Sequence, residues 1–132
     1  MKPAKFNKLL KEIYGEGKRV LNDASKGYSG DADRLSFFKR AGAIDGETPE
    51  QALKGMWKKH LTSVLDIIKM TEECPEKLTF ALVREKIVDS MNYHPLLLAL
   101  LIERIEAQED IKASDFVTSH KTINTNTNLI TR

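Results

Sequence analysis

Hydrophobic residues recur at helical spacing along almost the whole sequence, and this pattern limits the possible folds more than any other feature. Near the N-terminus, Phe6 and Leu10 belong to an apolar set spaced at about 3.6 residues, and lysines occupy another face. The pattern predicts an amphipathic helix from residue 3 to about residue 24, with a break near Gly15 and Gly17. No strand pattern appears before residue 116. The sequence therefore predicts an all-α protein.

Two turn-rich or capped segments divide the middle of the chain. Residues 26–33 contain two glycines, a serine and two aspartates, which is typical of a loop, and a short helix is expected over residues 34–43. Thr48, followed by proline and then by Gln51, forms a capping-box pattern. A long helix is expected from there to about residue 70, and it should end before Pro75.

The last predicted helix runs from residue 78 or 79 to about Glu106. Pro95 lies inside it, so we expect a kink or short break near Tyr93 and His94. From residue 116 to the end the chain is polar and β-prone, with no amphipathic period. The sequence predicts a compact bundle of three to four main helices over residues 1–115. It also predicts a polar tail over residues 116–132, which a neighbouring subunit would order.

Composition sets the class of protein. A chain of 132 residues is long enough for one core, and its longest apolar run is too short to cross a bilayer. No secretory h-region follows the first methionine, and the single Cys74 can make no internal disulfide. We therefore expect a cytoplasmic protein stabilised by packing, by oligomerisation or by both.

Charge is unevenly distributed, although the formal net charge is only +2. Residues 1–60 carry 13 Lys+Arg and 8 Asp+Glu, whereas residues 61–132 carry 8 and 11. The two halves could simply be solvated helix faces that differ in charge. Alternatively, a basic region attracts phosphate and faces an acidic region that holds a divalent cation. A total of +2 disfavours long nucleic acid and favours a small anionic ligand.

Three acidic residues are candidates for a metal site. Glu85 and Asp89 are four residues apart and share one helix face, and such a pair suits Mg²⁺. Asp66, on the preceding helix, would complete the set if the bundle brought it near. The alternative is that these acids lie on solvated faces or pair with neighbouring basic residues.

Polar residues on the helices and the first loop are candidates for ligand binding. Lys59 and His60 lie on the capped helix, although a histidine on an apolar face is more often a hydrogen-bonded core residue. Basic and aromatic residues are mixed around the loop. The basic residues could neutralise phosphate, and the aromatic residues could stack on a base. The candidate substrate-binding residues are Lys26, Tyr28, Lys39, Lys59, His60 and Asn92. No residue is assigned a catalytic role, and no phosphate-binding loop, nucleophile elbow or zinc motif is present.

Several blocks of the sequence together resemble one family over residues 5 to 106. The family is the small all-α "nucleotide modification associated" domain of phages and some bacteria, which is itself similar to the MazG-like nucleoside triphosphate pyrophosphohydrolases. The more specific blocks begin with Lys-His-Leu and with Glu-Lys-Ile. The blocks are Lys26-Gly27-Tyr28, Arg34 to Ala41, Thr48 to Gln51, Lys59 to Asp66 and Glu85 to Tyr93.

The resemblance implies an all-α nucleotide-binding protein of phage-type nucleotide metabolism, in the host cytoplasm, that hydrolyses a nucleoside phosphoanhydride with Mg²⁺. Glu85 with Asp89 corresponds to one acidic pair of those enzymes, but the second pair, on the preceding helix, is missing. One alternative is therefore a non-catalytic protein that sequesters a modified or signalling nucleotide. A further alternative is a helical adaptor with no small-molecule ligand.

A homo-oligomer is expected for two reasons. The related bundles build their sites between subunits. In addition, the apolar run around Leu97, Leu98, Leu100, Leu101 and Ile102 is broader than one helix face can bury in so small a bundle.

Overall fold

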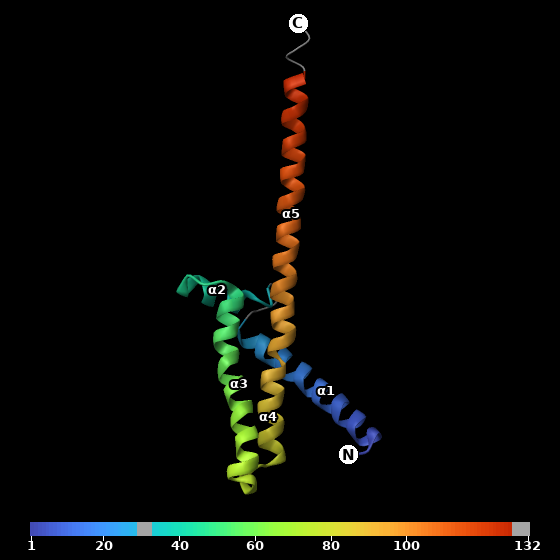
Figure 1. Cartoon of the computed structure of the whole chain (residues 1–132), viewed down its shortest axis with the longest axis vertical. Coiled ribbons are helices and arrows are strands. Elements are labelled where there is room, and N and C mark those ends of the chain that lie inside the picture. The colour runs from blue at the N-terminus through green and yellow to red at the C-terminus, as the bar shows by residue number, and fades with distance from the viewer. Residues whose placement is uncertain (29–32, 128–132) are drawn as a thin grey trace. The chain divides into compact units, whose positions relative to one another are not determined.

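The chain is helical in the part that the structure describes, so the all-α prediction is confirmed. The computed structural model describes the backbone of residues 1–28 and 33–127, and the side chains of residues 1–24, 26 and 33–115. Within these residues there is no strand (Figure 1). The elements are α1 (Pro3–Tyr28), α2 (Ser36–Asp45), α3 (Pro49–Glu73), the 3-10 helix η1 (Pro75–Lys77), α4 (Phe80–Met91) and α5 (Tyr93–Thr127).

The chain divides into two units, Met1–Ala99 and Leu100–Arg132. The first unit contains α1 to α4 and the start of α5; the described part of the second is the rest of α5. The predicted helix end near Glu106 is wrong, because α5 continues to Thr127 through residues with no amphipathic period. Each residue added to an existing helix gains a backbone hydrogen bond without a new nucleation step. A single domain over residues 1–115 and a tail ordered by a neighbouring subunit stay predictions.

The corner between α2 and α3 is the part of the fold that the sequence predicts best. The Thr48 side chain accepts a hydrogen bond from the backbone N–H of Gln51, whose own side chain accepts one from the Thr48 N–H at 2.9 Å. This confirms the capping box. At the end of α2, Gly46 adopts a φ of 69°, the left-handed conformation that glycine accepts without strain. Its N–H and that of Glu47 both bond to the Gly42 carbonyl.

Gly42 has no room for a side chain. A Cβ at this position would lie 2.7 Å from the Glu47 carbonyl oxygen and 3.0 Å from the Thr48 backbone, neither of which moves freely. We therefore expect Gly42→Ala to lower the free energy of unfolding by about 1–3 kcal/mol. Gly55→Ala is the matched control, since a Cβ there meets nothing within 4 Å.

In the control variant, alanine removes only the helix-interior penalty of glycine, so stability should rise by about 0.5–1 kcal/mol. Urea unfolding of the two variants measures both changes. Equal effects at Gly42 and Gly55 would show that the α2–α3 corner is not packed as described.

Helices α3 and α4 lie side by side and run in opposite directions, and η1 joins them (Figure 1). The chain leaves α3 at Glu73, two residues before Pro75, as the sequence predicts. Thr79 then caps α4 by accepting a hydrogen bond from the Leu82 N–H. Leu53 on α3 and Val88 on α4 are the most completely buried large side chains among those described. Helix α2 packs against α3.

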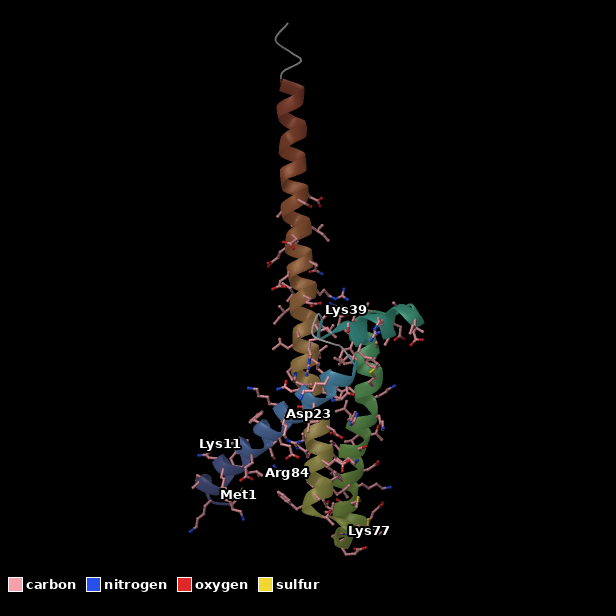
Figure 2. All side chains as sticks on the ribbon, turned by 180° about the vertical axis from the view of Figure 1, so that it is seen from behind. Met1, Lys11, Asp23, Lys39, Lys77 and Arg84 are labelled. Carbon is pink, nitrogen blue, oxygen red and sulfur yellow. The ribbon has the colours of Figure 1, made fainter. Side chains whose placement is uncertain are left out.

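Helix α1 packs against α4 and is continuous, so the predicted break at its glycines is wrong. Gly17 is instead buried at this helix contact. A Cβ at Gly17 would lie only 2.8 Å from the Met91 Cε and 2.9 Å from the Asn92 Oδ1. Arg84 of α4, which is labelled in Figure 2, lies on the same contact. It forms ion pairs with Glu12 and Glu16 of α1. Gly17 is thus explained by close helix packing, and Gly15, which has open space around it, remains helical without such a contact.

The predicted break near Pro95 is confirmed, and the single residue Asn92 forms it. Helix α4 ends at Met91 and α5 begins at Tyr93, so Pro95 occupies the first turn of a new helix. Backbone N–H groups in the first turn of a helix have no acceptor within the helix, so a proline there costs no hydrogen bond. The break places the polar side chains of Asn92 and Tyr93 at a junction between two helices.

None of the described helices is both long enough and apolar enough to cross a bilayer.

Candidate functional site

A pocket of about 380 Å³ lies within the unit Met1–Ala99. Its walls come from α1, the segment before α2, α2 itself, α3, α4 and the first turn of α5. This volume falls in the range of about 300–1,000 Å³ that is usual for small-molecule sites. The lining side chains are Val20, Leu21, Ala24, Arg34, Phe37, Phe38, Met56, His60, Asp89, Asn92, Tyr93 and Leu96.

The apolar wall of the pocket includes two phenylalanines of α2. The rings of Phe37 and Phe38 meet edge to face, with centroids 5.7 Å apart. Phe38 is buried in the core, whereas Phe37 is only half-buried. Phe37 therefore contributes a half-buried aromatic ring to the pocket lining.

The polar lining of α3, α4 and the helix junction contains an imidazole, a carboxylate and a phenol. His60 Nδ1 lies 3.8 Å from Asp89 Oδ2, and the rings of His60 and Tyr93 have centroids 5.1 Å apart. Burial, and secondarily the negative charge of Asp89, raise the pKa of Tyr93 above its ordinary value of 10.0. Tyr93 therefore keeps its hydroxyl proton at neutral pH and can both donate and accept a hydrogen bond.

Trp57 supports this lining from α3 without being part of it. Its ring stacks on Tyr93 with centroids 6.1 Å apart and an angle of 5° between the planes, and meets His94 edge-on at 4.7 Å. Its Nε1 donates a hydrogen bond to the buried Ser90 Oγ at 3.2 Å. Trp57 thus contacts both sides of the α4–α5 junction and holds Tyr93 in place.

Arg34 and Asp33 fix the segment that closes the pocket next to α2. Arg34 donates a hydrogen bond to the Leu21 carbonyl of α1. Asp33 accepts hydrogen bonds from Lys39 Nζ and from the Leu35 N–H, each at 2.9 Å. These bonds, that of Lys39 first, hold the pKa of Asp33 below its ordinary value of 3.8.

The depressed pKa of Asp33 predicts acid sensitivity. Because the folded chain binds this proton less tightly than the unfolded chain, the contribution stabilises the fold above pH 3.8 and is lost as the pH falls through the depressed value. We expect Asp33→Asn to lower the Tm at neutral pH by about 3 °C. The difference from the wild type should shrink toward pH 3, as thermal melts across this range would show. A constant difference would contradict the ion pair with Lys39.

The structure brings two of the six predicted substrate-binding residues together, since His60 and Asn92 both line the pocket. Lys26 is exposed on α1 and lies 3.4 Å from Asp23, and Lys39 pairs with Asp33. Lys59 is exposed on α3. The side chain of Tyr28 lies outside the described residues. The lysine predictions thus do not point to this pocket.

The three predicted metal ligands do not form a group that could hold a metal ion in the described part of the chain. Glu85 is exposed and pairs with Lys86 at 2.6 Å, which raises the pKa of Lys86, and Asp66 is exposed on α3. Asp89 instead lines the pocket with His60. Among the described residues, no three His, Cys, Asp or Glu side chains are grouped so that they could hold a metal ion. The Mg²⁺ site therefore stays a prediction.

The predicted site residues do not include Arg34, Phe37 or Tyr93. Arg34 and Phe37 belong to the mixture of aromatic and basic residues around the first loop, but nothing in their spacing distinguishes a pocket wall from a core edge. Tyr93 adjoins the helix break at Asn92. A predicted helix break next to polar residues is the sequence signal that points to Tyr93 as a site residue. Comparison with protein-family models, with curated proteins and with solved structures finds no match to this chain.

Proposed function

We propose that this chain binds a nucleotide in the pocket between its helices, without hydrolysing it. One observation carries the proposal: the pocket combines a half-buried aromatic ring, Phe37, with side chains that donate and side chains that accept hydrogen bonds. A purely apolar ligand would leave Asp89, Asn92 and Tyr93 without partners on the ligand. A small flat ligand with polar edges satisfies both parts of the lining.

Each part of a nucleotide has a suitable partner in the lining. The base would stack on Phe37, as bases do on aromatic rings in proteins. The Asn92 amide, which both donates and accepts, would bond to a base edge, and the Asp89 carboxylate would accept from sugar hydroxyls. Arg34 gives one donor to Leu21 and keeps other N–H groups for a phosphate.

Binding without hydrolysis is favoured by the positions of the acids. The MazG-like enzymes, to which the resembled family is similar, hydrolyse phosphoanhydrides with acidic pairs that hold Mg²⁺. Here Glu85 and Asp66 are both exposed, and neither lines the pocket. The pocket contributes one carboxylate, that of Asp89. A protein that sequesters a nucleotide needs only the recognition groups.

Hydrolysis is the second candidate, and the His60–Asp89 pair favours it. An imidazole beside a carboxylate can accept a proton from an attacking water molecule, and the carboxylate stabilises the imidazolium that results. In that case Asp89→Asn would abolish turnover.

The single tryptophan gives a direct test. Because Trp57 stacks on the pocket residue Tyr93, a ligand that contacts Tyr93 should change the Trp57 fluorescence. Nucleoside mono-, di- and triphosphates would be titrated with Mg²⁺ and with EDTA, while phosphate and pyrophosphate release is followed. Saturable fluorescence change and a raised Tm without product would support the proposal.

Two other outcomes decide against it. Product formation that is lost in Asp89→Asn would show that the protein hydrolyses the nucleotide and does not only bind it. No change in fluorescence or Tm with any nucleotide would overturn both candidates and leave a helical adaptor without a small-molecule ligand.

A further inference from the structure

Helix α3 has a second apolar face that the described fold leaves exposed. Leu61, Leu65 and Ile68 have 42%, 64% and 59% of their surfaces accessible, and their spacing of four and three places them on one stripe. The buried face of α3, which includes Leu53 and Ile67, points elsewhere. Three large exposed aliphatic side chains in a row are unusual unless something covers them.

Charged residues flank this stripe with opposite signs at its two ends. Lys58 lies seven residues before Leu65, and Glu72 lies seven residues after it. Seven residues are close to two helical turns, so both charges lie on the same side as the stripe, about 10 Å from Leu65. Both are exposed. The stripe thus has a basic end, an apolar centre and an acidic end.

We propose that the α3 stripe is the interface with a second copy of this chain, in which the two α3 helices pack antiparallel with Leu65 on the two-fold axis. In this arrangement Lys58 of one copy lies opposite Glu72 of the other, and symmetry repeats the pair. The apolar residues cover each other between the two ion pairs. A parallel arrangement would instead place Lys58 against Lys58 and Glu72 against Glu72.

The charge pattern selects a second copy as the occupant. When two copies of one surface pack around a two-fold axis, each residue on one side of the axis faces the residue at the same distance on the other side. An apolar centre with opposite charges at equal distances is complementary to itself in this arrangement. An unrelated apolar helix would gain nothing from this symmetry. The proposal does not depend on nucleotide binding, because the stripe contains no residue that lines the pocket.

Charge reversal provides the first test. Sedimentation velocity over a range of concentrations should give a dimer of the 15.0 kDa chain. Lys58→Glu alone and Glu72→Lys alone should each raise the dimer Kd by at least about tenfold, because each creates two like-charge contacts. The double variant, Lys58→Glu with Glu72→Lys, should restore the Kd. Ile44→Glu, at an exposed position on α2, is the control and should leave it unchanged.

Cysteine crosslinking tests the antiparallel register, in a Cys74→Ser background. Leu65→Cys should form a disulfide between two copies on mild oxidation, because this position faces itself. A mixture of Lys58→Cys and Glu72→Cys chains should crosslink, whereas Lys58→Cys alone should not. A monomer at every concentration, additive rather than compensating charge reversals, or crosslinking of Lys58→Cys to itself would overturn the proposal. Circular dichroism would confirm that each variant remains helical.

Discussion

Replacing Leu53 by alanine is expected to lower the free energy of unfolding by about 3 kcal/mol and the Tm by about 10 °C. Leu53 is only 1% exposed, and only it and Val88 are buried to that degree among the large side chains described. Truncation removes apolar contacts and leaves a cavity that the surrounding helices can only partly close. Urea denaturation followed by circular dichroism measures the change.

Ile44→Ala is the matched control for this experiment. Ile44 is also a branched aliphatic residue on a helix, but 83% of its surface is exposed, so its truncation should change stability by less than about 0.5 kcal/mol. Similar losses at Leu53 and Ile44 would mean that the core is not centred on α3 and α4. A large loss at Leu53 alone would establish that centre experimentally.

Replacing Phe37 by alanine is expected to weaken nucleotide binding by about 5- to 150-fold, provided that the pocket takes a nucleotide. Loss of base–aromatic stacking costs about 1–3 kcal/mol, which corresponds to that range. Phe37 is suited to the test because it is half-buried, whereas the neighbouring Phe38 belongs to the core and its truncation would disturb the fold. Titration of Trp57 fluorescence with the nucleotide gives the affinity.

Two further variants separate stacking from simple burial. Phe37→Tyr keeps the aromatic face and should retain most of the affinity, whereas Phe37→Leu keeps apolar bulk and should lose much of it. Ile44→Ala, on the same helix but outside the pocket lining, should bind as the wild type does. Equal affinity for Phe37→Leu and the wild type would show that the ring does not stack on a base.

The sequence predicts much of the local structure because its signals are local. The capping box at Thr48, the stop before Pro75 and the break next to Pro95 each depend on a few neighbouring residues, and all three are confirmed. The prediction of a break at Gly15 and Gly17 is wrong for a related reason. Whether a glycine breaks a helix or admits a close neighbour depends on Met91 and Asn92, which are far away in the sequence.

The candidate site is less predictable because it is assembled from distant segments. The sequence predicts His60 and Asn92 as binding residues and Asp89 as a metal ligand, yet only the packing of α3 against α4 shows that His60 and Asp89 meet. Charge makes the lysines candidates for phosphate binding, but the pairing of Lys39 with Asp33 depends on how the chain turns before α2. Charge alone does not show whether a lysine already has a protein partner.

The packing of α1 on α4 also predicts an order in which the walls of the pocket form. The ion pair between Glu16 and Arg84 joins residues 68 apart in sequence, whereas the contacts of α2 with α3 join near neighbours. Contacts between distant residues pay the larger loop-closure entropy, so they tend to form late in folding. Since Val20, Leu21 and Ala24 of α1 line the pocket, a nucleotide would act only on chains that have already docked α1. Such a ligand should slow unfolding and leave the rate of folding nearly unchanged.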